Sequence, residues 1–334
     1  MSLSAYRPLR NLLIHVSLPW KHEIMSSTQK LLVVFGATGH QGGSVIRTVL
    51  QDADLKKQYV LRGTTRDPDS PGAQALADQG VEVVKADVED PASLRKAFEG
   101  AHTVFANTIT VYDGHAYEHE VAHGKALAGA AMAAGVPYYI YSTLPHAGQI
   151  SGLKHMGHFD GKAEAEAYIR TLPMKSAFIA PGSFMENFHA SLTPRPMGDV
   201  YGIANFVAPE TQLPLIAAAN DTGKWVAAIL ADFERYNGQV LCCATRLYSM
   251  QETVEIMSKA SGKTVVYKQL PREVWSGFLP EMMRDHIGDM FEHFQRSGYY
   301  GPETEERVVW SAKQARGTLT SLEEYLQAHP LQLG

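Results

Sequence analysis

The chain has 334 residues, of which 45% are hydrophobic and 19% are charged. This length suits one large domain or about two domains, and the composition is wrong for a disordered or collagen-like chain. Thirty Lys and Arg residues against thirty-five Asp and Glu residues give a formal net charge of −5. No basic excess is present to neutralise a nucleic-acid backbone, so we predict no direct nucleic-acid binding.

The N-terminal segment, residues 1–29, differs in composition from the rest of the chain. Arg7, Arg10 and Lys21 alternate with apolar residues, and Met25 lies shortly before the first predicted strand. We expect an upstream start or a disordered extension here, and a transit peptide is the alternative.

The cysteines and the apolar runs indicate the compartment. Cys242 and Cys243 are adjacent, which suits neither a disulfide framework nor a metal site and favours a reducing compartment. No apolar run has the length of about 18 residues that predicts a membrane span. We therefore expect a cytoplasmic protein with no membrane contact, with the nucleus as the alternative.

The first predicted strand leads into a glycine-rich turn. Residues 31–35 are apolar throughout, as in a strand buried on both faces of a parallel sheet. Gly36, Gly39 and Gly42 come next, and apolar residues then recur at helical spacing. Such glycines permit a tight turn, close approach of a diphosphate and close helix packing, while the helix N-terminus faces the negative charge. We predict a dinucleotide-binding turn, with a purely structural turn as the alternative.

The ends of the next two predicted strands indicate the cofactor type. The strand at residues 59–65 ends at Arg66, where an NAD-binding protein usually places a carboxylate. Arginine would pair with a 2′-phosphate instead, so we predict NADP(H), with NAD(H) or an exposed loop arginine as alternatives. The strand predicted at residues 81–86 is followed by Asp87 and Val88, where such folds meet the adenine.

The alternation of strands and helices predicts the fold class. Asp90 and Pro91 have the chemistry of a helix start, and a fourth strand is predicted at residues 103–106. This spacing predicts right-handed crossovers and a Rossmann-like, doubly wound parallel α/β sheet.

A zinc-peptidase pattern, H-E-x-x-H, occupies residues 119–123, with His115 one turn earlier. A catalytic zinc needs a third ligand from another part of the chain. This helix lies within the strand-helix alternation, where its outer face meets solvent. We interpret the pattern as a solvated helix face and predict no metal site.

Candidate catalytic residues come after the fifth predicted strand, residues 136–141. Ser142 stands at the strand's carboxyl end, where open α/β sheets bind ligands. Lys162 lies four residues after His158 and precedes a helix predicted at residues 163–170. Short-chain reductases use a tyrosine and a lysine at this spacing, the lysine gripping the nicotinamide ribose and the tyrosine giving a proton to a carbonyl oxygen. His158 could donate that proton near neutral pH, or it could be a structural or ribose-contacting residue.

Three blocks in this order resemble the NmrA-like family of atypical short-chain dehydrogenases: residues 36–45, residues 65–68 and H-F-D-G-K at residues 158–162. The likeness runs from about residue 30 to the C-terminus and is strongest to the branch of the human NADPH-sensing protein. It implies a reductase-like fold that binds NADP. In that branch it also implies a sensor or a transcription-factor partner without the catalytic tyrosine.

The resemblance also implies the cofactor contacts. These are Gly36, Thr38, Gly39, His40, Gln41 and Gly42 at the diphosphate, Arg66 at the 2′-phosphate, Asp87 and Val88 at the adenine, and Thr108, Lys162, Ser183, Phe184 and Asn187 towards the nicotinamide. The chain departs from the family pattern at Ala122, where the human-type sequence carries a cofactor-contacting lysine, and by one extra residue after Pro181.

Beyond a sixth predicted strand, residues 174–180, the regular alternation stops. We predict a Rossmann domain over residues 30–181 and a smaller mixed α/β lobe over residues 182–334. Residues 221–246 would return to the Rossmann sheet as a helix capped by Asp221 and a strand at residues 239–243. An apolar set could form a core, a lid over the substrate cleft or a partner dock: Trp275, Phe278, Met282, Met283, Met290, Phe291 and Phe294.

Two functions fit these observations. The first is an NADP(H)-binding redox sensor or regulator that acts through a protein partner such as a transcription factor, because the dinucleotide turn is present and the tyrosine is missing. The second is an NADPH-dependent reductase of a small carbonyl, imine or activated alkene, with Lys162 and either His158 or Ser142 assisting proton delivery. A homodimer is compatible with both.

Overall fold

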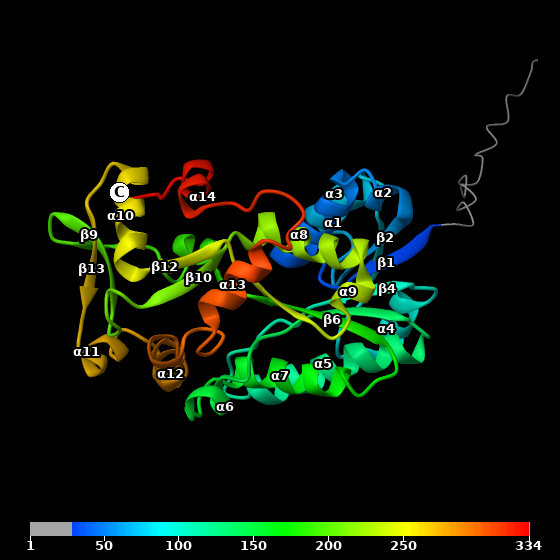
Figure 1. Ribbon diagram of the computed structural model, residues 1–334, viewed down its shortest axis with the longest axis horizontal. Coiled ribbons are helices and arrows are strands. Elements are labelled where there is room, and N and C mark those ends of the chain that lie inside the picture. The colour runs from blue at the N-terminus through cyan, green and yellow to red at the C-terminus, as the bar shows by residue number, and fades with distance from the viewer. Residues whose placement is uncertain (1–28, 334) are drawn as a thin grey trace, which may run out of the picture.

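The computed structural model describes residues 29–333 (Figure 1). Its central sheet has seven strands in the order β11-β6-β5-β4-β1-β2-β3, and all neighbouring pairs are parallel. The strands are β1 (Lys30–Val34), β2 (Tyr59–Thr65), β3 (Glu82–Lys85), β4 (Thr103–Ala106), β5 (Tyr138–Ser142), β6 (Lys175–Pro181) and β11 (Val240–Cys243). The predicted Rossmann-like, doubly wound fold is confirmed.

Helices cover both faces of this sheet (Figure 1). The face with the α1–α8 pair carries α1 (His40–Gln51), α2 (Leu55–Gln58), α3 (Pro71–Ala77), α8 (Ala218–Ala231) and α9 (Phe233–Tyr236). The opposite face carries α4 (Pro91–Phe98), α5 (Ala116–Ala133) and α7 (Gly157–Ile169). The strands between them are therefore apolar on both sides, and Leu32, Val33 and Val34 of β1 are fully buried.

The strand order reverses between β1 and β4. In open α/β sheets this reversal leaves a crevice beyond the carboxyl ends of the two strands, where ligands bind. Gly36 lies just after β1 and Asn107 just after β4, and a Cβ added to Gly36 would lie 3.0 Å from Asn107 Oδ1. The fold therefore brings the glycine-rich turn and the end of β4 together.

The smaller lobe is mixed. It holds two three-stranded sheets, ordered β12-β10-β7 and β13-β9-β8. Its strands are β7 (Ser183–Phe184), β8 (Arg195–Met197), β9 (Val200–Asn205), β10 (Gln212–Ile216), β12 (Arg246–Ser249) and β13 (Val265–Gln269). Its helices are the 3-10 helix η1 (Met185–His189), α10 (Met250–Ser261), α11 (Arg272–Ser276), α12 (Glu281–Ser297), α13 (Thr304–Ala312) and α14 (Leu322–Ala328). The short helix α6 (Ala147–Ser151), which comes earlier in the chain, packs against α12.

Two predicted helix starts differ from the structure. The helix predicted from residue 163 begins at Gly157, so His158 and Lys162 both lie on α7. Asp221 is not the cap of α8, because it lies fully buried inside the first turn, where it accepts hydrogen bonds from Thr320 and Lys224. The carboxylate of Glu186 performs the capping instead, accepting from the backbone N–H groups of Ala218 and Ala219 at 3.2 and 2.7 Å.

Other local predictions are confirmed. Asp90 caps α4 by accepting from two backbone N–H groups, with Pro91 in the first turn. Cys242 and Cys243 are buried in β11, and burial raises the pKa of the Cys242 thiol to about 12, which disfavours thiolate chemistry.

Between residues 29 and 333 no helix combines the length and the apolar character needed to cross a membrane. The extension predicted at residues 1–29 lies, except for its last residue, outside the described residues.

Candidate functional site

The glycine-rich turn leaves the start of α1 open to an anion. Gly36 has a φ of +70°, a conformation that side chains disfavour. A Cβ at Gly42 would lie 2.3 Å from the Gly36 carbonyl oxygen, so only glycine lets α1 pack this closely on the turn. The N-cap residue Gly39 makes no side-chain cap, and the first turn has no acidic residue. Its free backbone N–H groups are therefore available to a ligand.

Gln41 and Ser142 join this turn to the end of β5. The Ser142 hydroxyl, which is buried, donates to Gln41 Oε1 at 2.8 Å. Thr38 and His40 are exposed on the turn. Because the Ser142 proton is used in the bond to Gln41, Ser142 acts here as a positioning residue for the turn. Its predicted catalytic role stays a prediction.

Arg66, Asp87 and Val88 lie after β2 and β3 at the same edge of the sheet. Arg66 is exposed and makes no hydrogen bond or ion pair within residues 29–333, so its guanidinium is available to a ligand. Asp87 Oδ1 accepts from the backbone N–H of Glu89 at 3.1 Å, and Val88 is half-buried against the core. Arg66 thus lies near Asp87 and Val88 at the edge of the sheet that carries the turn, although the two segments are separated in sequence.

Lys162 is buried and fully hydrogen-bonded. Its ammonium donates to Glu120 Oε2 at 2.8 Å, to the Thr108 carbonyl at 3.2 Å and to the Thr108 hydroxyl. An ammonium has three protons, so all of them are used. Burial lowers the pKa of Lys162, while the Glu120 carboxylate opposes this effect.

Glu120 corrects the prediction of a solvated helix face, because its side chain is fully buried. Its carboxylate also accepts from the hydroxyls of Thr108 and of Thr110, the latter at 2.6 Å. The cause is the close packing of α5 on α7, where a Cβ at Gly161 would lie 2.7 Å from Glu120 Cβ. Glu120 therefore belongs to the site and not to the surface of α5.

The histidines of the H-E-x-x-H pattern have other partners. His119 pairs with Asp113 at 2.9 Å, and His123 lies 3.7 Å from Glu89. Among the described residues, no group of three His, Cys, Asp or Glu side chains is arranged to hold a metal ion. Glu120 is a site residue that the sequence reasoning missed. Lys162, which was predicted as a site residue, was the one clue to it, because a lysine ammonium that becomes buried needs a nearby carboxylate.

His158 lies one turn before Lys162 on α7 and is buried, with a buried Nδ1 that has no hydrogen-bond partner in the described chain. Burial first, and then the neighbouring His286 and Lys162, lower the pKa of His158 well below its usual value. The ring is therefore neutral at pH 7, with one nitrogen carrying a proton and the other a lone pair.

Ser183, Phe184 and Asn187 lie on β7 and η1 and are all half-buried. Phe184 packs against the core under the α1–α8 face. The Asn187 carbonyl accepts from the backbone N–H groups of Ala190 and Leu192 at 3.0 and 2.8 Å. Its neighbour Glu186 caps α8, so this short segment is anchored to the Rossmann domain.

Asn107 adds a polar group that the sequence reasoning did not select. Its Oδ1 is buried beside Gly36 and has no hydrogen-bond partner in residues 29–333. Buried polar atoms are almost always hydrogen-bonded in a complete protein. This unpaired acceptor at the β1–β4 reversal therefore fits a ligand that donates a hydrogen bond there.

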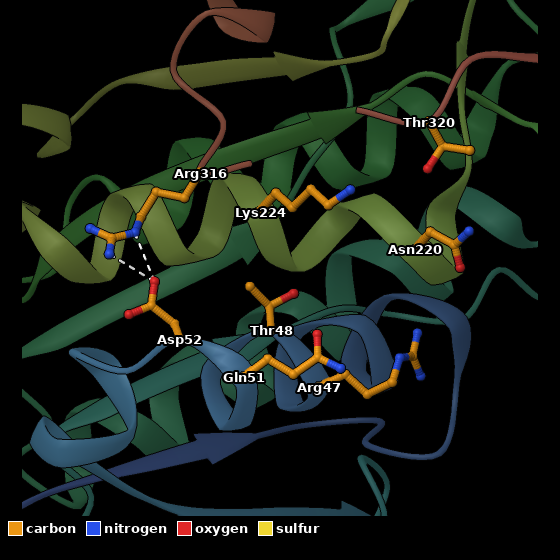
Figure 2. A pocket seen from close by; sticks show the side chains of 8 residues that line it. All are labelled: Arg47, Thr48, Gln51, Asp52, Asn220, Lys224, Arg316 and Thr320. Carbon is orange, nitrogen blue, oxygen red and sulfur yellow. Dashed lines mark hydrogen bonds and ion pairs between the residues drawn. The ribbon is translucent and has the colours of Figure 1, made fainter. Parts of the chain in front are cut away.

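A separate polar pocket of about 460 Å³ lies between α1 and α8 (Figure 2). Arg316 is ion-paired with Asp52 at 2.8 Å and Lys224 with Asp221 at 2.6 Å, while Arg47 donates to the Ala219 carbonyl. Its α1 residues come from the second half of the helix, away from the glycine-rich turn. It therefore does not belong to the site described above.

Comparison with known proteins identifies the family. The model of the NmrA-like family matches residues 28–326. The chain is similar to the NmrA-like family domain-containing oxidoreductase ptmS of Penicillium ochrochloron, 32% identical over 76% of this chain and 79% of the relative. It is also 31% identical to the oxidoreductase FrzB of Cladobotryum sp, over 83% of this chain and 88% of that one.

Solved structures of similar proteins indicate the same family. NmrA, a negative transcriptional regulator, has been solved with NADP and with NAD; each structure covers 91% of this chain and 96% of its own, at 25% identity and a TM-score of 0.77. Triphenylmethane reductase of Citrobacter sp. with NADP(H) shares the fold, at 22% identity, 89% and 99% coverage and a TM-score of 0.70. The chain therefore belongs to the NmrA-like family.

Proposed function

We propose that this protein binds a nicotinamide dinucleotide across the carboxyl edge of the seven-stranded sheet. The open N-terminus of α1 carries the proposal, since its first turn offers backbone N–H groups with no side-chain cap and no competing carboxylate. The close contact of Gly42 with Gly36 and the unpaired Asn107 Oδ1 fit the same ligand. The NAD and NADP complexes of NmrA support this proposal.

The proposed contacts are those expected from the sequence. Gly36, Thr38, Gly39, His40, Gln41 and Gly42 would hold the diphosphate, Arg66 the 2′-phosphate, Asp87 and Val88 the adenine, and Thr108, Lys162, Ser183, Phe184 and Asn187 the nicotinamide half. Arg66 is exposed and has no carboxylate partner among the described residues. We therefore propose NADP(H) as the preferred form.

We further propose that the protein is a reductase of a small carbonyl, imine or alkene. The bound cofactor supplies the hydride. His158 carries this proposal, because its neutral ring lies one turn from Lys162 with an unused buried nitrogen. From that position the ring can hold or transfer one proton at Nδ1. Lys162 and Glu120 fix α7 against α5, and a ribose contact by Lys162 would replace one of its present bonds.

The order of the two functions is thus the reverse of the order that the sequence suggested. Relatives at 27–32% identity, including ptmS and FrzB, are named oxidoreductases. The second candidate, a redox sensor of the human NADPH-sensing type that acts through a partner, is favoured by one observation. All three protons of Lys162 are used internally, which is the arrangement of a structural lysine.

Calorimetry with NADPH and NADH, together with a screen of carbonyl, imine and alkene compounds at the absorbance of NADPH, tests both proposals. The reductase account predicts NADPH binding and turnover of at least one class, with turnover reduced at least about tenfold in His158→Phe. NADPH binding without turnover on any class supports the sensor. Failure to bind either dinucleotide contradicts both functions.

A further inference from the structure

Two imidazole rings from different lobes meet beside Lys162. His158 belongs to α7 of the Rossmann domain and His286 to α12 of the smaller lobe. Their ring centroids are 4.6 Å apart, with the planes tilted by 37°. His158 Nδ1 and His286 Nε2 are both buried, and neither has a hydrogen-bond partner within residues 29–333. Buried polar atoms are rarely left unpaired, so this pair is prepared for a ligand.

The protonation of the rings restricts that ligand. A neutral imidazole carries a proton on one ring nitrogen and a lone pair on the other. Burial lowers the pKa of both His158 and His286, so both rings are neutral at pH 7. The ligand group that fits is a neutral oxygen able to donate or accept a hydrogen bond, rather than a carboxylate or a phosphate.

The surroundings of the pair are apolar and aromatic. The Tyr112 ring packs edge-on against both imidazoles, with centroid distances of 6.0 Å to His158 and 5.4 Å to His286. Tyr112 lies in the segment between β4 and α5 and is 48% exposed. Exposed apolar side chains accompany it: Ile109 in the same segment, and Met282, one turn before His286 on α12. A ligand with an aromatic body matches these surfaces.

We propose that His158, His286 and Tyr112 form the substrate site, and that the substrate is a neutral aromatic compound bearing a hydroxyl or carbonyl oxygen. The oxygen binds between His158 Nδ1 and His286 Nε2, and the aromatic ring packs against Tyr112. This inference rests on the proposed oxidoreductase function, because it places the oxygen one helical turn from Lys162. It also gives the smaller lobe a role, since His286 selects the substrate from that side.

Binding of simple probes tests the site without turnover. We would titrate the NADP⁺-saturated protein with 2-naphthol, 2-acetylnaphthalene and 2-ethylnaphthalene, monitoring probe fluorescence. The proposal predicts that the two oxygen-containing probes bind about tenfold tighter than 2-ethylnaphthalene, because only they can satisfy the unpaired nitrogens. Equal affinity for all three probes, or no binding of any, would overturn it.

Variants assign the effect to the two rings. His158→Phe and His286→Phe keep an aromatic ring and remove the nitrogens, and each should abolish most of the tenfold preference. His102→Phe is the matched control, because His102 stacks on Tyr138 at 4.9 Å immediately before β4, at the opposite edge of the sheet. A preference that persists in His286→Phe contradicts the proposal.

Two further readouts keep the outcome decisive. In ¹⁵N-histidine-labelled wild-type protein, 2-naphthol should shift the ring nitrogens of two histidines, and no shift would overturn the site even if a variant fails to fold. Calorimetry with NADPH on the same samples separates the two claims. If the wild-type protein does not bind NADPH, the proposed function is wrong. If it binds NADPH but shows no preference among the probes, only the proposed substrate site is wrong.

Discussion

The two ends of the proposed cofactor site are built differently. The diphosphate end consists of backbone N–H groups and glycines within residues 36–42, all local in sequence. The nicotinamide end and the substrate site beside it bring together side chains from three helices, with Glu120 on α5, Lys162 on α7 and His286 on α12. Local backbone geometry can be read from a motif, whereas the meeting of distant side chains depends on how closely the helices pack.

The largest effect is expected at the nicotinamide end. Glu120→Gln should lower the free energy of unfolding by about 3–5 kcal/mol, because it leaves the buried Lys162 ammonium without a carboxylate. Urea unfolding measures this, with Glu118→Gln, an exposed neighbour on α5, as the control. The double variant Glu120→Gln/Lys162→Met should recover much of the loss. A loss below about 1 kcal/mol in the single variant would mean that the pair is not the anchor described here.

At the diphosphate end, Gly42→Ala should weaken NADPH binding at least about tenfold and destabilise the fold by about 1–3 kcal/mol. The added Cβ would lie 2.3 Å from the Gly36 carbonyl oxygen, so the turn must move. Calorimetry and thermal unfolding measure the two effects. Gly129→Ala on α5 is the control, because its Cβ would meet only the Tyr168 hydroxyl, at 4.0 Å. Unchanged binding in Gly42→Ala would exclude this turn as the diphosphate site.

Acid should destabilise the protein through three histidines, His158 on α7 and His286 and His293 on α12. Burial lowers the pKa values of His158, His286 and His293 in the folded state, whereas unfolded histidines titrate near about 6.5. Below that pH the unfolded chain binds more protons, so stability falls as pH decreases, by up to about 1.4 kcal/mol per pH unit for each such histidine. Urea unfolding between pH 7 and 5 should show a shallower decline in His158→Gln than in the wild type. Identical declines would show that folding does not lower the pKa of His158.

The smallest effect concerns the choice of dinucleotide. Arg66→Ala should weaken NADP⁺ binding about tenfold and leave NAD⁺ binding nearly unchanged, since only NADP⁺ carries the 2′-phosphate. Competition calorimetry measures the ratio. Arg195→Ala, which removes another exposed arginine from β8 of the smaller lobe, is the charge-matched control. Equal weakening of both dinucleotides would assign Arg66 to a different contact.

The same contrast explains what the sequence could predict. The doubly wound sheet could be predicted from apolar strands alternating with helices, and the capping of α4 from Asp90 and Pro91, because these signals are local. The burial of Glu120 was missed because it depends on Gly161 bringing α5 against α7. The capping of α8 by Glu186 was missed because the two residues it contacts lie more than thirty positions away.

His286 gave no sequence signal, since nothing near it in the chain resembles a site. Only the structure identifies it, because its ring packs against His158 of α7 and its Nε2 has no hydrogen-bond partner in the described residues. The approach of α12 to α7 comes from packing of the smaller lobe, where Phe159 of α7 contacts Phe294 and Tyr299. A pattern search in one sequence cannot supply such a contact.

A crystal structure of the protein with NADPH tests the central claim most directly. The account predicts the diphosphate at the backbone N–H groups that begin α1, the 2′-phosphate at Arg66 and the nicotinamide half beside Thr108 and Lys162. A dinucleotide bound elsewhere, for example between α1 and α8, or a turn that stays closed to NADPH at saturating concentration, would contradict it.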